Sequence, residues 1–557
     1  MTLNEKERDT VMQLNVIWKC ARAAVVEITE DSVYHTENLW NIYINDELYG
    51  KTDTVETYID GLEPLTTYSI RYECSTNETN DNTADDLGNN NTETRNEAVT
   101  TVSGILVTDD ETFTLNVRDF GAAGDGERDD TISIQAAIMS CPARGRVLIP
   151  AGDYRIKNLF LTSGISLELA EGATLHARHD RENLAYLPDT IEGKPGAGYA
   201  GTNLLPMGRW EGEGMPMFCG ILSGMAVHDV TVYGRGVIDG GANANDDNWW
   251  HDPKTIRIAA RPRMIFLSDC ERMDFAGITV RNSPSWNIHP VLSRDLGFWC
   301  LNVEGPKVSP NTDGLDPESC TNVTIKGCHF SVGDDCIAVK SGKIGMPREL
   351  RPACRNLLID QCYMHDGHGS VVLGSEAAGG IRGLIARNCL FERTDRGLRI
   401  KTRRGRGKDS VYEAITFDHI RMDGVLTPFV VNSFYYCDVD GKTEYVQDRG
   451  PRPVDERTPK VASLIFNDIE ATNCHAAATY ITGLPESKVG RAEFHNVHVT
   501  YAQDAQPARP AMASGVEPMV RQGIIAQNVE RLVLDDVTID GQDGDELQLT
   551  NVDHVER

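Results

Sequence analysis

The chain has 557 residues, of which 40% are apolar and 25% are charged, as is typical of a soluble globular protein with a sizeable core. Its formal net charge of -29 argues against nucleic acid as a partner, because phosphate binding needs a basic surface. No run of 18 apolar residues occurs, so we expect no membrane span and no membrane partner.

The first residues, MTLNEKERDTVMQLNVIW, lack the apolar core of a signal peptide. The 14 cysteines show neither CxxC pairs nor the spacing of zinc ligands. We therefore expect free thiols and a cytoplasmic location. A chain shortened at its N-terminus could still be secreted.

Residues 12 to about 105 contain short stretches of alternating apolar residues separated by turn signals, which predicts an antiparallel β unit. The stretch WNIYINDELYGKTDTVETYIDGLEPLTTYSIRY resembles a fibronectin type III domain, with Leu62, Pro64 and Tyr68 in the usual pattern. We predict a small β-sandwich over residues 1–108. The Asn-rich stretch 75–97 is predicted to be a long loop.

From about residue 112, apolar residues recur at offsets 0, 2, 5 and 7, as in Met273, Phe275, Ile278 and Val280. Further copies begin at residues 296, 323, 357, 384, 415, 464 and 532. Each copy predicts two short strands that meet at a bend and point their apolar residues the same way. Variable spacing between the copies indicates a solenoid with variable loops. The predicted fold is therefore all-β, with a parallel β-helix over residues 109–557. A propeller is the alternative, but its blades need four strands each.

Cysteines occupy the same position in three successive copies, at Cys328, Cys362 and Cys389. We predict that they stack as a small apolar ladder in the core rather than forming disulfides or a metal site.

Polar motifs follow the copies at matching distances. Asp334 lies four residues after one copy, and His368 lies four residues after the next. Asp313 follows the preceding copy across a looser turn, and Arg399 and Lys401 follow the copy that ends at Phe391. Equivalent positions on neighbouring coils lie about 4.8 Å apart. The motifs NTD, GDD, GHG and RIK should therefore converge in one patch.

Such a patch would hold three carboxylates, one imidazole and two cations. Clustered carboxylates raise one another's pKa, so that one can donate a proton while others activate water, as glycoside hydrolysis requires. The cations suit a substrate that carries its own carboxylate. Taken singly, GDD is a common turn, and the basic run 396–408 could be a solvated edge.

The motifs NTDG, GDDC, GHGS and RIK, in this order, resemble the four signature segments of glycoside hydrolase family 28, the polygalacturonases. Residues 116–138 resemble the opening segment of pectin-acting β-helices, with Ile132, Ile134 and Ala137 on a short helix that caps the solenoid. The resemblance implies a right-handed parallel β-helix and an inverting hydrolase that uses no metal and no cofactor.

The resemblance also implies a role for each matched residue. Asp334 corresponds to the general acid, Asp313 and Asp335 to the pair that activates water, and His368 to the residue that orients the acid. The sequence alone does not separate Asp334 from Asp335. The implied substrate-binding residues are Arg399 and Lys401, which grip a galacturonate carboxylate, and Asn311 and Gly369, which shape the site.

The RIK motif favours galacturonan over rhamnogalacturonan, and the fibronectin-like unit together with residues 283–291 resembles the exo-acting branch. Trp286 and His289 are predicted to line the non-reducing end. The long segments 182–220 and 240–262, with Trp210, Trp249 and Trp250, are predicted to close one end of the groove. We therefore expect exo-acting hydrolysis of galacturonate oligosaccharides or pectin, with trimming of imported oligomers inside the cell.

Several alternatives stay open at this point. They are an endo-polygalacturonase, a rhamnogalacturonan or xylogalacturonan hydrolase, a pectate lyase, and a sugar-binding β-helix without activity. A lyase would need acidic calcium sites and a basic catalyst, and a mere binder of an anionic sugar has little use for three clustered aspartates. The sequence does not indicate an oligomeric state, and an oligomer is possible.

Overall fold

The computed structural model describes residues 12–76, 98–243, 249–250 and 260–557. The chain folds as two compact units, Met1–Glu111 and Thr112–Arg557, whereas the sequence places their boundary after residue 108. None of the helices in the described ranges is long and apolar enough to cross a membrane.

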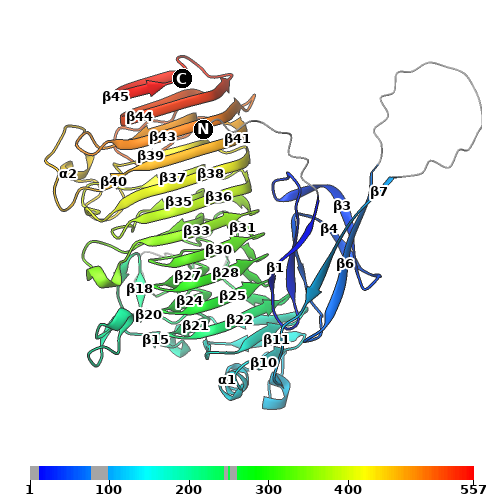
Figure 1. The fold of residues 1–557 in the computed structure, drawn as a ribbon. Coiled ribbons are helices and arrows are strands. Elements are labelled where there is room, and N and C mark those ends of the chain that lie inside the picture. The colour runs from blue at the N-terminus through cyan, green and yellow to red at the C-terminus, as the bar shows by residue number, and fades with distance from the viewer. Residues whose placement is uncertain (1–11, 77–97, 244–248, 251–259) are drawn as a thin grey trace, which may run out of the picture. The chain divides into compact units, whose positions relative to one another are not determined.

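The first unit is a sandwich of two antiparallel sheets, with strand orders β1-β2-β5 and β4-β3-β6-β7 (Figure 1). Trp40 and Tyr72 from one sheet and Ile28 and Ile59 from the other pack together in its core. The predicted Asn-rich loop lies outside the described residues, apart from its first two positions. The strands are β1 (Leu14–Lys19), β2 (Ala24–Ile28), β3 (His35–Ile44), β4 (Glu47–Thr54), β5 (Glu56–Ile59), β6 (Thr67–Thr76) and β7 (Ala98–Val107).

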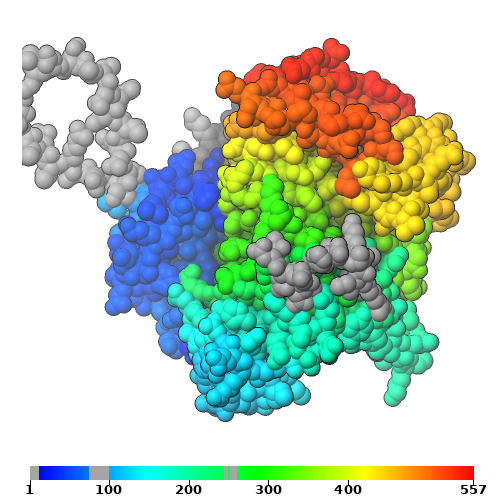
Figure 2. Space-filling model, turned by 180° about the vertical axis from the view of Figure 1, so that it is seen from behind, coloured from blue at the N-terminus to red at the C-terminus, as the bar shows by residue number. Residues whose placement is uncertain are grey.

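The second unit is a parallel β-helix, which confirms the predicted fold class. Figure 1 shows its coils stacked in chain order from β10 to β45, and Figure 2 shows the same order of colours from behind. The first face consists of β8 (Thr114–Asn116), β10 (Arg146–Ile149), β13 (Ser166–Leu169), β22 (His228–Gly234), β25 (Glu271–Ala276), β28 (Arg294–Trp299), β30 (Thr321–Lys326) and β33 (Cys354–Asp360). The second face consists of β9 (Asp125–Asp129), β11 (Gly152–Ile156), β14 (Ala173–Ala177), β23 (Val237–Asp239), β26 (Thr279–Arg281), β29 (Asn302–Glu304), β31 (His329–Val332) and β34 (Tyr363–Asp366).

In the later coils, one strand runs through the bend between these two faces. These strands are β36 (Ile381–Glu392), β38 (Val411–Asp423), β41 (Ser463–Cys474), β43 (Val489–Tyr501) and β44 (Gln522–Asp540), with β40 (Lys460–Val461) beside β38. We call the third face the site face. Its strands are β12 (Leu159–Phe160), β21 (Leu222–Met225), β24 (Ile265–Ser268), β27 (Ile288–Val291), β32 (Asp335–Val339), β35 (Gly369–Gly374), β37 (Arg396–Lys401), β39 (Thr427–Asn432), β42 (Ala477–Thr482), the start of β44, and β45 (Leu547–Glu556).

The remaining elements are short and lie in the connections. Three small antiparallel strand pairs lie within residues 186–218: β15 (Tyr186–Leu187) with β20 (Met217–Phe218), β16 (Ile191–Glu192) with β17 (Leu204–Leu205), and β18 (Arg209–Trp210) with β19 (Glu213–Gly214). The helices are α1 (Thr131–Ser140) and α2 (Glu444–Gln447), with 3-10 turns at Val117–Phe120, Arg181–Asn183, Tyr199–Gly201 and Arg348–Leu350.

The strand register follows the apolar repeat. Met273 pairs with Leu296, and Leu296 in turn pairs with Val323, so that offset 0 stacks on offset 0 along the solenoid. A further copy, which begins at Ala492, pairs with the copies at Leu464 and Leu532. The repeat therefore fixes which residues face the core.

A left-handed residue marks the bend of each copy at offset 4, between the two short strands. These residues have φ angles of 48 to 73° and are Gly277, Cys300, Gly327, Gln361, Asn388, His419, Asp468, Asn496 and Asp536. Glycine, asparagine and aspartate adopt this conformation most readily, which explains their frequency at this position. The bend lets offsets 2 and 5 both point into the core.

The cysteines at the repeated position are fully buried in the main core cluster. Cys328, Cys362 and Cys389 have no exposed surface, and no disulfide joins any of the 14 cysteines, all of which lie in the described part of the chain. The ladder thus consists of small, apolar-packed thiols without a disulfide, as predicted.

Helix α1 covers the first coil. Ile134 and Ala137 are buried against the main core, as a capping helix requires. Ile132 lies on the same helix, but 83% of its surface is exposed, so this residue does not contribute to the cap.

We expect Phe298→Ala to lower the free energy of unfolding by about 3 to 5 kcal/mol, the usual cost of deleting a buried aromatic ring. Phe298 is fully buried and stacks on Phe275 with ring centroids 5.6 Å apart. Phe113→Ala is the matched control, since Phe113 is 57% exposed and its loss should change stability by about 0.5 kcal/mol at most. Denaturant titration measures the free energy of unfolding of both variants. Equal losses would contradict the placement of Phe298 in the core.

Candidate active site

The four sequence motifs converge on the site face because its strands continue the same register. Ile288 pairs with Leu315, and Leu315 pairs with Ile337 on the next coil. Asp335 pairs with Gly369, so the residues just before them, Asp334 and His368, also occupy equivalent positions. The predicted stacking of GDD on GHG is therefore observed.

Three carboxyl groups meet at the centre of this face. One oxygen each from Asp313, Asp334 and Asp335 lies within 4.8 Å of the other two. His368 Nδ1 is 3.2 Å from Asp334 Oδ1. This hydrogen bond is the largest influence on the imidazole and raises the pKa of His368. The imidazole of His368 therefore holds Asp334, the most exposed of the three carboxyl groups.

Asp335 is the anchored member of the three. Lys401 Nζ donates to its Oδ2 at 2.6 Å, and Arg399 Nη1 donates to its Oδ1 at 3.1 Å. Although burial alone would raise it, these two positive charges hold the pKa of Asp335 well below its usual range. The cations therefore keep Asp335 ionised.

Asp313 has the opposite environment. Burial, followed by repulsion from Asp316 and Asp334, raises its pKa well above the usual value. Asp316 lies just beyond it and is fully buried, and its burial raises the pKa of Asp316 to about 7 in spite of Lys340. Neighbouring carboxyls thus have pKa values pushed in opposite directions, which is how acid and base roles are divided in active sites.

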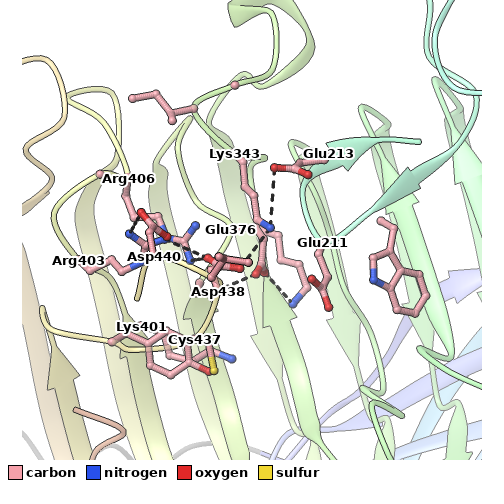
Figure 3. A pocket seen from close by; sticks show the side chains of 18 of the residues that line it. Glu211, Glu213, Lys343, Glu376, Lys401, Arg403, Arg406, Cys437, Asp438 and Asp440 are labelled. Carbon is pink, nitrogen blue, oxygen red and sulfur yellow. Dashed lines mark hydrogen bonds and ion pairs between the residues drawn. The ribbon is translucent and has the colours of Figure 1, made fainter. Parts of the chain in front are cut away.

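A cavity of about 870 Å³ opens over the carboxyl cluster. Asp313, Asp334, Asp335 and Lys401 line it near the cluster, and a group of charged side chains lines its other part. Figure 3 shows this second group, whose labelled members include Glu211, Lys343, Glu376, Arg403, Arg406 and Asp438. A cavity of this size can hold a small oligosaccharide.

A pair of tryptophans forms one wall of the cavity. Trp210 and Trp286 stack with ring centroids 5.4 Å apart and an interplanar angle of 7°. Trp210 comes from the hairpin β18–β19, within the long segment 182–220. The hairpin is fixed by a buried ion pair between Arg209 and Glu318 and by a hydrogen bond from Lys343 N to Gly212 O. Part of the long segment thus reaches the cavity.

The structure places the remaining predicted residues at varying distances from the cavity. Asn311 lines it and accepts a hydrogen bond from Arg261, whereas Gly369 is buried at the start of β35 beside Arg399. His289 is fully buried behind Trp286, where its Nε2 lies 3.1 Å from Glu318, and it is not among the cavity-lining residues.

Trp249 and Trp250 lie in a separate buried cluster with Leu184 and Phe218, and they do not line the cavity. The neighbouring residues 244–248 and 251–259, on which part of the predicted groove closure depends, lie outside the described residues.

Several cations of the cavity, among them Lys340 and Arg261, were not found by sequence analysis. Lys340 ends the apolar run CIAVK, and a lone lysine in such a run signals a buried counter-charge. Arg261 donates to Pro310 O and Asn311 Oδ1, and burial lowers its pKa to about 10. It belongs to a long connection outside the repeat, so no register could have placed it.

Comparison with known proteins identifies the family of this fold and site. The model for glycosyl hydrolases family 28 matches residues 145–512, well over half of the chain. The protein belongs to glycosyl hydrolase family 28. A second model, for the rhamnogalacturonase A/epimerase, pectate lyase-like group, matches residues 114–168 of this family 28 member.

Proteins similar in sequence to this family 28 chain include one named as an endo-polygalacturonase and one, from Dickeya chrysanthemi, named as an exo-poly-alpha-D-galacturonosidase. The chain is 32% identical over 303 residues to a probable polygalacturonase of Vitis vinifera, covering 52% of this chain and 57% of that protein. It is 29% identical over 318 residues to an endo-polygalacturonase of Pectobacterium carotovorum, covering 55% and 72%. The family 28 exopolygalacturonase of Yersinia enterocolitica shares its fold, with a TM-score of 0.65, 18% identity, and coverage of 97% and 98%. The match thus spans little more than half of the grapevine protein.

Proposed function

We propose that the protein hydrolyses α-1,4-galacturonosidic bonds in galacturonan oligosaccharides, with inversion and from the non-reducing end. The observation that carries this proposal is the cluster of Asp313, Asp334 and Asp335 under one cavity, with Arg399 and Lys401 bound to Asp335. Family membership and polygalacturonase relatives support the substrate class.

Asp334 is the proposed general acid. Its side chain is 22% exposed at the cavity, and His368 holds one of its oxygens. The free oxygen edge can reach the glycosidic oxygen of a bound sugar and give it a proton. After the transfer, the imidazole of His368 stabilises the new carboxylate.

Asp313 and Asp335 are the proposed water-activating pair. Since their oxygens lie within 4.8 Å of each other, one water at about 2.8 Å from each can bridge them. Asp335 is a weak base because two cations bind it, whereas Asp313 has a raised pKa and is the stronger proton acceptor. Asp335 thus orients the water, and Asp313 accepts its proton.

Inversion rests on the family resemblance. Carboxyl groups of inverting enzymes typically lie about 6.5–9.5 Å apart, and those of retaining enzymes about 5–5.5 Å. One oxygen each from Asp313, Asp334 and Asp335 lies within 4.8 Å of the other two. This distance falls below the inverting range, so the geometry alone does not support inversion. Proton NMR of the first product decides: release of the β-anomer supports inversion, and release of the α-anomer means retention.

Lys401 and Arg399 follow Asp335 along the coils, and Trp286 precedes Asp313. When a sugar carboxylate meets the cations, the part of the cavity beside Trp210 and Trp286 is left for the sugar across the scissile bond. The hairpin that carries Trp210 stands at this side of the cavity. This placement supports a blocked groove and attack from the chain end.

For an exo-acting enzyme we expect galacturonic acid as the earliest and sole released product. The substrate is a galacturonate oligomer with a reduced end, and chromatography follows the products from the first minutes. A blocked groove admits only one sugar beyond the scissile bond, so each cut releases a monomer. A spread of shorter oligomers at early times would mean an open groove and endo action.

We also propose that the first unit is a fibronectin type III domain and that the enzyme works in the cytoplasm. The Tyr68 hydroxyl accepts a hydrogen bond from Glu63 N at 2.7 Å, which matches the tyrosine corner of such sandwiches. The lack of disulfides among the 14 cysteines, all within the described residues, suits a reducing compartment. Cell fractionation tests the location, and accumulation of the protein outside intact cells would contradict it.

A further inference from the structure

Lys340 lies directly under the proposed water-activating pair. It follows strand β32, and bridge pairing sets it beside Glu318 on the preceding coil. Only 2% of its surface is exposed, and its Nζ lies 4.6 Å from the centre of the Trp286 ring. A lysine this deeply buried is rare unless it is paired with acids.

Three carboxylates share this single ammonium group. Lys340 Nζ is 3.3 Å from Asp316, 3.6 Å from Asp313 and 3.6 Å from Glu376. Figure 3 shows Glu376 among the charged side chains of the cavity. Asp313 and Asp316 lie in and just after the NTDG turn and Glu376 lies in the segment after β35, so Lys340 ties these two parts of the coils together.

The charges around Asp313 leave Lys340 as its nearest cation. Arg399 and Lys401 are bound to Asp335, and Arg261 donates to neutral oxygens. The charged groups that act on Asp313 are Asp316, Asp334, Asp335, Lys340 and Arg261. Those that act on Lys340 are Asp313, Asp316, Asp335, Glu376 and His289. Without the ammonium, Asp313 and Asp316 would face each other in a buried space, and uptake of a proton by one of them would be favoured still further.

We propose that Lys340 is a positioning residue for hydrolysis, whose buried ammonium favours the ionised form of the Asp313 carboxylate aimed at the attacking water. This inference rests on the proposed function, because it assigns Lys340 a task in the same reaction. Glu376 binds the ammonium group from the segment after β35. Asp316 repels the negative charge of Asp313, and the ammonium offsets this repulsion. Lys340 itself takes and gives no proton in the reaction.

The first test is the pH dependence of kcat/KM for Lys340→Met in the full-length protein. The acid limb of this profile reports the essential base of the free enzyme. Removal of a cation next to a carboxylate raises its pKa by about 1 to 3 units, so the acid limb should move to higher pH by at least about one unit. Below the shifted limb, activity should fall about tenfold per unit.

Two companion variants separate an electrostatic effect from structural damage. Lys340→Arg keeps the charge and should keep the wild-type limb. The double variant Lys340→Met with Asp316→Asn also removes the carboxyl that repels Asp313, and the limb should return toward the wild-type position. Lys326→Met is the matched control, since Lys326 is also buried and lies 3.4 Å from Asp360 but does not line the cavity. It should lower stability without moving the limb.

An unshifted limb in Lys340→Met, or a shift that Asp316→Asn leaves in place, would overturn the proposal. Infrared titration gives a reading that is independent of activity. The C=O band of a protonated carboxylic acid should appear at higher pH in Lys340→Met than in the wild type. If the wild type hydrolyses no galacturonan, the proposed function fails, and the infrared result then decides on its own whether Lys340 favours the ionised form of Asp313.

Discussion

Asp334→Asn should lower kcat by about 10² to 10⁴-fold, the range that a positioned general acid contributes. The amide has the same shape and can still accept the hydrogen bond from His368, but it cannot give a proton to the leaving oxygen. Because the side chain stays in place, KM should change little. Initial rates of reducing-end formation on oligogalacturonate measure both constants.

The matched control is Asp295→Asn, on the exposed side of the first face, where an amide also suits the left-handed backbone. This variant should keep wild-type rates. The comparison with Asp335→Asn separates two adjacent acids that the sequence alone leaves equivalent. If Asp334→Asn retained full kcat while Asp335→Asn lost it, the acid would be Asp335 and the proposed roles would be wrong.

Lys401→Met should raise KM by about tenfold or more and also reduce stability. A charge-assisted hydrogen bond contributes about 1.5–3 kcal/mol, and loss of one partner of a buried ion pair costs about 3–5 kcal/mol. Lys401 has such a bond to Asp335 and also borders the cavity, where the substrate carboxylate is proposed to bind. Steady-state kinetics and denaturant titration measure the two effects.

The stability of Lys401→Met should also depend on pH in a defined direction. In the wild type, the pKa of Asp335 lies well below its usual range, so the stabilisation persists down to strongly acidic pH. In Lys401→Met the pKa moves back up, and the stabilisation is lost at higher pH as the medium is acidified. Lys408→Met is the control, because its pair with Glu456 is on the surface. Equal acid stability of Lys401→Met and the wild type would contradict this account.

The fold was predictable because one spacing governs each coil. The apolar offsets of the copy at Met273 recur through Leu532, and strand pairing joins like offsets. Counting from the end of each copy then placed Asp334 and His368 together without knowledge of the loops. Where residues lie on the repeat, sequence position sets spatial position.

Residues outside the repeat were not predictable in this way. Trp210 and Arg261 reach the cavity from long connections whose paths depend on buried contacts, such as the Arg209–Glu318 pair. His289, which the sequence predicts to line the non-reducing end, is covered by neighbouring side chains. This residue lies on the site face, but Phe266 and Trp286 pack against its ring and separate it from the cavity. A pattern of strands cannot show what a distant hairpin covers.

The central claim is that this carboxyl cluster cleaves galacturonan by addition of water. The most direct measurement follows reducing ends and the ultraviolet absorbance of unsaturated uronates together, on polygalacturonate, for the wild type and Asp334→Asn. We expect the wild type to form reducing ends without an absorbance rise, and Asp334→Asn to form almost none. A parallel rise in absorbance would show a lyase, and binding of the polymer with no new reducing ends would show that the cluster only holds the sugar.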